Sequence, residues 1–178
     1  MNPTERRSLI ADRSGIAAIE FALLLPVLLV IYFGIVELVQ AVTVGRLVAQ
    51  TSSTVTNIVS QYTTISASTQ MPDVLGASSQ ILAPYPSASA GIIVSLISVD
   101  NNGNATIAWS QSQNATAHST GQAVTLPASL DVPNSSVVWG EVSYAYAPIF
   151  DFLNLGPFNM YDSVYMLPRN ATTINLAS

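Results

Sequence analysis

Hydrophobic residues are concentrated in one long run near the N-terminus. Residues 16–39 read IAAIEFALLLPVLLVIYFGIVELV, and Glu20 and Glu37 are the only charged residues in this run. At 1.5 Å per residue, a helix of this length covers the ~30 Å hydrocarbon core of a bilayer. The pattern therefore predicts one membrane-spanning helix.

Beyond this run the apolar positions become periodic, with Ser and Thr between them. They recur at helical spacing at Leu47, Val48, Val55, Ile58, Val59 and Tyr62. This spacing predicts that the helix continues to residue 62 with one buried face. Ser and Thr are weak helix formers, so tertiary packing must stabilise this part. The two parts together predict one rod over residues 16–62, roughly 70 Å long.

The next part of the chain combines an irregular stretch with a β-hairpin. Residues 66–90 are rich in Ser, Pro and Gly and predict a loop or irregular connection. Two β-type runs follow, over residues 91–99 and 104–110. The tripeptide between them, Asn101-Asn-Gly103, favours a tight hairpin turn.

The last third of the chain predicts two further strands after an exposed excursion at residues 111–136. Residues 136–146 alternate well, with Val138, Val142, Tyr144 and Tyr146 on one face and Val137, Trp139 and Glu141 on the other. Residues 149–160 are aromatic and broken by Gly and Pro, which predicts a short helix or hydrophobic flap. Residues 163–167 predict a final strand. The expected fold class is α+β, with a head of about four antiparallel strands at residues 63–178.

The distribution of charge orients the chain and excludes one class of partner. Among 178 residues there are five arginines and no lysine, and the net charge is −5. Arg6, Arg7 and Arg13 give residues 1–15, which we predict to be a basic leader, a net charge of +1, whereas the remainder carries −6. The positive-inside rule then predicts a cytoplasmic N-terminus and an exported segment over residues 45–178. A lysine-free acidic body offers nucleic acid no basic surface.

The sequence contains no constellation that predicts catalysis, a metal site or a cofactor. There is no cysteine, and His118 is the only histidine, in a Ser- and Thr-rich stretch without regular spacing to an acid. Metal sites and Ser-His-Asp systems need several groups that converge on one point, so we expect a solvated loop histidine. The run from Asp100 is similar to a calcium loop, but Gly103 is misplaced and Gln111 stands where the closing Glu belongs. We expect no enzyme activity, no metal and no cofactor, which leaves an exported hydrolase without support.

Three hypotheses account for the hydrophobic run. A cleaved signal peptide has a usable small-x-small site at Val39-Gln-Ala41, but its apolar region is usually 7–15 residues long and uncharged. A generic signal anchor is compatible with the length but does not explain Glu20. An ionised carboxylate inside an apolar helix is costly in lipid and indicates a functional partner. If the chain were cut between Gly15 and Ile16, Glu20 would be the fifth residue after the new amino group.

This arrangement resembles type IV pilin precursors, and the segment RSGIAAIEFALLLP at residues 13–26 is similar to the start of the TadE-like family. These are pseudopilins of the tight-adherence (Flp-type) pilus system. Residues 141–148 (EVSYAYAP) and the ending Leu167-Pro-Arg169 also resemble the C-terminal part of the TadE/TadG group. The Asp-x-Ser-x-Ser metal motif of TadG-like relatives is absent, which favours a TadE-like protein. The resemblance implies a pilin-like fold.

The resemblance also implies partners and site residues. Prepilin peptidase would cleave between Gly15 and Ile16, and Glu20 and Phe21 would complete the motif that it recognises. Glu20 would pair with the N-terminal ammonium of a neighbouring subunit. Further partners would be the Flp-type major pilin, TadE/TadF-like minor pilins, and the Tad platform and ATPase. The protein would reside in the bacterial inner membrane with a periplasmic head, and would function in the pilus or as an anchored accessory or adhesin outside it.

Pro26 lies inside the predicted span. Proline removes the hydrogen bond to the carbonyl of Ala22 and predicts a kink. Membrane helices tolerate such a kink where neighbouring groups satisfy the freed carbonyl. Two interpretations stay open, a harmless kink and a bend that helps the helix to pack into a fibre.

Overall fold

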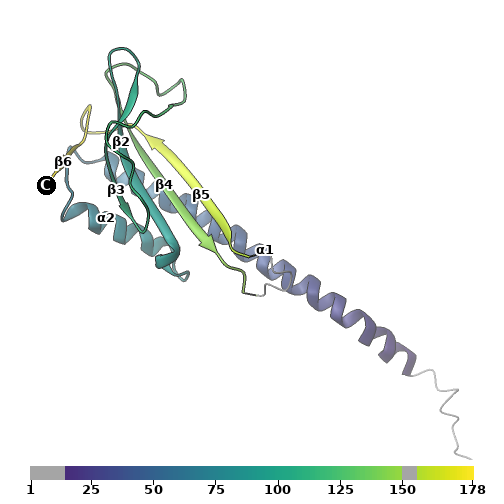
Figure 1. Ribbon diagram of the computed structural model, residues 1–178. Helices are drawn as coiled ribbons and strands as arrows, with labels where there is room; N and C mark the ends of the chain where they lie inside the picture. The colour runs from purple at the N-terminus through teal and green to yellow at the C-terminus, as the bar shows by residue number, and fades with distance from the viewer. Residues whose placement is uncertain (1–14, 150–155) are drawn as a thin grey trace, which may run out of the picture. The chain divides into compact units, whose positions relative to one another are not determined.

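The computed structural model describes residues 15–149 and 156–178, and it confirms the predicted α+β class (Figure 1). A long helix, α1 (Ile16–Ser60), precedes a small domain that contains a four-stranded antiparallel sheet. The chain divides into two units between Gln40 and Ala41. We call the second unit, residues 41–178, the head.

Helix α1 is continuous through the apolar run and the amphipathic continuation. All of its buried residues lie from Val44 onward, namely Val44, Val48, Thr51, Ser52, Val55, Thr56, Val59 and Ser60. The predicted stripe is therefore present, although Leu47, Ile58 and Tyr62 are only partly buried. The α-helix ends at Ser60, two residues before the predicted end, and Tyr62 N–H closes a last turn on the carbonyl of Val59.

The sheet has the strand order β3-β2-β4-β5. Strands β2 (Ala90–Val99) and β3 (Ala105–Gln113) form the predicted hairpin, and β4 (Ser136–Tyr146) pairs with β2 and with β5 (Phe158–Met166). The hairpin turn is built by Asp100, whose carboxylate accepts the N–H groups of Asn102 and Asn104 at 2.8 Å. Gly103 adopts φ +81°, a conformation that glycine tolerates without strain.

The prediction of an irregular connection over residues 66–90 is wrong. This stretch contains helix α2 (Gln70–Ser79), followed by the 3-10 turns η2 (Gln80–Leu82) and η3 (Ser87–Ser89). The buried positions of α2 follow helical spacing at Met71, Val74, Leu75 and Ser78. Only three of these four residues are apolar, and the Ser- and Gly-rich surroundings conceal the period. Pro72 stands in the first turn of α2, where no intrahelical N–H bond is lost.

Three other predictions need correction. No strand is predicted at residues 64–66 or 175–177, whereas β1 (Thr64–Ser66) and β6 (Asn175–Ala177) form a two-stranded parallel sheet. Residues 111–113 belong to β3, and Ala123 bridges Thr106, so the excursion partly covers the β3 edge. Strand β5 begins at Phe158, five residues before the predicted strand. Of the predicted flap at 149–160, residues 150–155 lie outside the described part.

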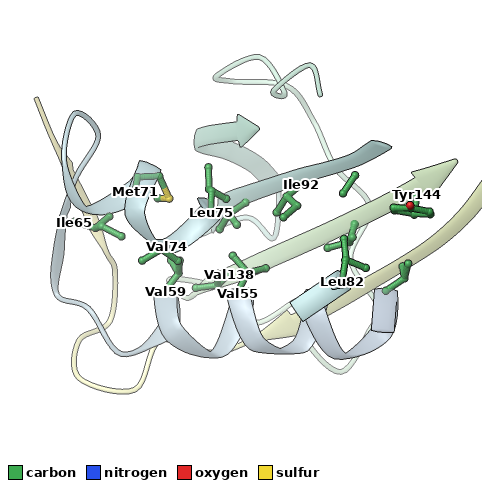
Figure 2. Close-up of a cluster of buried hydrophobic side chains, with 14 of the residues drawn as sticks. Val55, Val59, Ile65, Met71, Val74, Leu75, Leu82, Ile92, Val138 and Tyr144 are labelled. Atoms are coloured by element: carbon green, nitrogen blue, oxygen red, sulfur yellow. The ribbon is translucent and has the colours of Figure 1, made fainter. Parts of the chain in front are cut away.

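Side chains pack on both faces of the sheet, and the alternation of β4 follows the prediction. Figure 2 shows the larger cluster, in which side chains from α1, α2 and the sheet meet. Val138, Val142, Tyr144 and Tyr146 belong to this cluster. Val137 packs in a smaller cluster with Ile97, Val99, Ala105, Ile107 and Leu126 on the other face.

Candidate assembly site

The first turns of α1 contain the residues predicted to guide processing. Gly15 is the first described residue, and Ile16 is the first residue of α1, so the predicted scissile bond lies where the helix begins. Both residues are exposed. The leader arginines Arg6, Arg7 and Arg13 lie outside the described residues.

Glu20 is exposed on an otherwise apolar helix surface. Its neighbours one turn away, Ile16 and Leu24, are 51% and 60% exposed, and the adjacent Phe21 is 59% exposed. Side chains on a helix tilt toward its N-terminus. The carboxylate of Glu20 is therefore directed toward the end of the helix at which cleavage would create an ammonium group.

Pro26 lies within α1, and the residues on both sides of it are helical. The helix thus continues through the proline, and the kink stays a prediction. Pro26 and its neighbours are exposed, as are all residues from Gly15 to Tyr32.

The N-terminal part of α1 fits a membrane anchor. Within residues 15–149 and 156–178, α1 is the one helix that is both long and apolar enough to cross a bilayer, and its most apolar stretch is unburied. An apolar surface of this size is stable only in lipid or against other apolar helices.

The head contains a polar cluster that the sequence did not reveal. Glu141 is 7% exposed, and its carboxylate accepts a hydrogen bond from the Tyr161 hydroxyl at 2.7 Å. Nε2 of His118 lies 2.6 Å from the other carboxylate oxygen. His118 also stacks on Trp139, with 4.8 Å between ring centroids, and Trp139 stacks on Tyr165. The prediction of a solvated histidine is therefore wrong.

This cluster joins the β3–β4 connection to one face of the sheet. His118 comes from the connection, whereas Trp139, Glu141, Tyr161 and Tyr165 come from β4 and β5. Because His118 and Glu141 are 23 residues apart with an irregular segment between them, no periodic signal links them. Among the described residues, no group of three or more His, Cys, Asp or Glu could hold a metal ion. The arrangement acts as a tether between a loop and the sheet.

The electrostatics of the cluster favour neutral phenols. Partial removal from water raises the pKa of Tyr161 to about 12, and the hydrogen bond to Glu141 adds to this effect. The pKa of Tyr165 is also raised, first by burial and then by the negative charge of Glu141. Both tyrosines therefore stay protonated, and Tyr161 remains a hydrogen-bond donor to the buried carboxylate.

An apolar N-terminal helix followed by a small domain with a four-stranded antiparallel sheet defines an α+β protein with a candidate membrane anchor. Residues 15–56 match the family model described as TadE-like protein. This part of the chain is thus TadE-like, which confirms the predicted resemblance and suggests a protein associated with the Tad pilus. The match does not extend to residues 141–148 or 167–169. No curated protein and no solved structure matches the chain.

Proposed function

We propose that the protein is a minor pilin, or pseudopilin, that acts in the assembly of a tight-adherence (Flp-type) pilus. It is anchored in the bacterial inner membrane by α1, with a cytoplasmic N-terminus and a periplasmic head. Prepilin peptidase cleaves it after Gly15. The observation that carries this proposal is the exposed carboxylate of Glu20 on an apolar helix surface, four residues after Ile16.

Cleavage would create an ammonium group that can pair with the carboxylate of Glu20. A carboxylate in hydrocarbon is costly, and so is a free ammonium group. When the ammonium of one subunit meets the carboxylate of another, the two charges compensate each other and their helices are joined. The partners in this scheme are the peptidase, the Flp-type major pilin, TadE/TadF-like minor pilins, and the Tad platform and ATPase. The cluster around Glu141 has no part in it, and we propose no enzymatic activity.

The mature N-terminus tests the first step. We expect the protein isolated from its native membranes to begin at Ile16, as measured by intact mass and N-terminal sequencing. A chain that retains Met1 would contradict peptidase processing, and one that begins at Val42 would instead indicate a cleaved signal peptide. A Gly15→Leu variant provides the control, since it is expected to retain the leader and still insert.

Substitution of Glu20 tests the pairing. We expect Glu20→Gln to insert normally, but its affinity for other pilins should fall because the neutral amide cannot form the proposed ion pair. The expected loss is roughly tenfold, or about 1.4 kcal/mol. Co-purification with the major pilin measures this association. Glu37→Gln is the matched control, because it removes an acid from the same span away from the cleavage site. Equal co-purification of both variants with the unaltered protein would contradict the proposed role of Glu20.

Shearing of surface pili distinguishes the proposal from its alternative. A minor pilin is expected in the sheared fibres together with the major pilin. An anchored accessory or adhesin would remain in the membrane fraction. Recovery of the mature protein in the membrane fraction alone would favour the alternative.

A further inference from the structure

Both edges of the four-stranded sheet have backbone groups without a partner strand. In the order β3-β2-β4-β5, the edges are β3 and β5. Residues 121–124 cover the first part of β3, where the N–H of Ile107 donates to Gln122 and its carbonyl accepts from Gly121. Among the described residues, no backbone hydrogen bond joins residues 109–113 of β3, or any residue of β5, to a further segment. We call residues 109–113 the free part of β3.

The strand registers show which backbone groups point outward from the two edges. In antiparallel pairs, successive residues hydrogen-bond alternately to one neighbouring strand and to the other. Because the groups of Ile107 point away from β2, those of its partner Ile97 point to β4, and the regular pairings carry this alternation on to β5. The register shift between β2 and β3 reverses the alternation in the free part of β3. The residues whose backbone groups point outward include Ser110 and Ser112 in β3, and Tyr161, Ser163 and Tyr165 in β5.

Strand β5 is suited to pair with the free part of β3 in a second copy of the chain. It is regular over nine residues and contains neither proline nor lysine, which commonly protect an edge strand from pairing. Three antiparallel pairings separate β3 from β5, so the two strands run antiparallel to each other. A second copy in the same orientation therefore presents its β5 antiparallel to β3 of the first.

A sheet that continues without stagger into the second copy defines one register. Within one copy, Trp109 and Met166 stand in the same row across the four strands, through Leu96 and Val138. Met166 of the second copy would therefore face Trp109 of the first. Because β5 ends at Met166, it would occupy the free part of β3 and leave residues 121–124 in place.

This register matches both backbone groups and side chains. Ser163 would face Ser112, and the backbone groups of both point outward, so the two residues can exchange hydrogen bonds. Val164 would face Gln111 in a pair without hydrogen bonds. Gln111 lines a groove of about 320 Å³ between α2 and β3, to which α2 contributes Met71. No charged residue is among the described residues that line this groove, which suits an apolar side chain such as that of Val164.

We propose that β5 of one copy adds to the free part of β3 in the next copy, so that neighbouring heads share a continuous sheet. Each copy uses a different edge toward each neighbour, so the contact can repeat from copy to copy. The inference goes beyond the proposed function, because pilins can associate through α1 alone. It concerns contacts of the head and rests neither on cleavage after Gly15 nor on Glu20.

The absence of cysteine permits a disulfide test of this contact. Gln111→Cys and Val164→Cys are single variants of the full chain, expressed together in a host without prepilin peptidase. Opposed residues of a pair without hydrogen bonds lie about 4.5 Å apart at Cα, within the range of a disulfide. Thr106→Cys is the matched control for Gln111→Cys, because Thr106 lies in the part of β3 that Ala123 bridges. Membranes are oxidised with copper phenanthroline, and non-reducing electrophoresis measures the dimer.

We expect a disulfide-linked dimer when Gln111→Cys and Val164→Cys are expressed together. Neither variant alone should give it, nor should Thr106→Cys together with Val164→Cys. Addition of Ser112→Pro to the Gln111→Cys chain should abolish the dimer, because proline lacks the outward N–H but is tolerated at an edge. Cooperative urea unfolding shows whether each variant is folded.

The absence of a dimer from the folded pair of variants would overturn this inference. A dimer formed by Val164→Cys alone would assign β5 to pairing with itself, and a disulfide from Gln111→Cys to another protein would assign the edge of β3 to that protein. Either result would overturn the inference as well. The mature N-terminus is measured separately, so a failure of the proposed function is distinguishable from a failure of this contact.

Discussion

Glu141 and Glu20 differ in the surroundings of their carboxylates. Glu141 is buried in the head, and Tyr161 and His118 of the same chain contact its carboxylate. Glu20 is exposed on the surface of an apolar helix, and its proposed partner is a second subunit. The sequence shows both acids, but only Glu20 stands in a regular apolar pattern that makes its charge conspicuous. The role of Glu141 depends on contacts that connect distant parts of the chain.

The raised pKa of Tyr161 leads to a prediction about alkaline pH. Its pKa in the folded protein is about 12, above the ordinary value of about 10. Stability from the neutral phenol is therefore fully present below pH 10 and is lost as the pH rises from about 10 to about 12. We expect ultraviolet titration of tyrosinate to show a late component that disappears in Tyr161→Phe.

Glu141→Gln separates the two causes of this shift. Because the amide carries no charge, Tyr161 is expected to ionise at a lower pH in this variant, while burial still keeps its pKa above the ordinary value. An unchanged titration in both Tyr161→Phe and Glu141→Gln would contradict the assignment of the late component to Tyr161.

At the scale of elements, α1 packs closely against β4, since a Cβ added to Gly140 would lie 1.9 Å from Oγ1 of Thr56. The added Cβ at Gly140 would also lie 3.3 Å from the carbonyl oxygen of Ser52, so the helix backbone itself approaches the strand. We expect Gly140→Ala to lower the free energy of unfolding by about 1–3 kcal/mol through overpacking. Urea unfolding of the full chain in detergent, followed by tryptophan fluorescence, measures the change.

Two variants test the origin of this effect. Thr56→Ala removes the Oγ1 atom that the new methyl group would meet, so it is expected to restore part of the stability in combination with Gly140→Ala. Gly76→Ala is the matched control, because a Cβ at Gly76 meets nothing within 4 Å and Ala favours a helix interior. Equal effects of Gly140→Ala and Gly76→Ala would show that packing against α1 is not the cause.

At the scale of the whole molecule, the two units differ in what stabilises them. The buried residues of α1 begin at Val44, so the residues before Ala41 contribute none to the core. We expect a chain exported to the periplasm from Ala41 onward to fold and to remain in the soluble fraction. Its free energy of unfolding is expected to lie within about 0.5 kcal/mol of that of the full chain.

A longer deletion gives the comparison for this prediction. A chain that begins at Ser53 lacks four buried residues of α1 and is expected to lose cooperative unfolding, since those residues form part of the core. Circular dichroism and urea unfolding measure the stability of both truncated chains. An unfolded chain from Ala41 would contradict the independence of the head.

The sequence by itself determined the helix from Ile16 and its amphipathic continuation, the hairpin at Asn101–Gly103 and the alternating faces of β4. Each depends on neighbours in the chain, because the side-chain periods of helix and strand and the preferences of turn residues are local. Only the tertiary structure decided α2, the pairing of β1 with β6, and the tether of His118 to Glu141. Their apolar signals are weak or their strands short, so contacts between distant residues supply the stability that local preference does not.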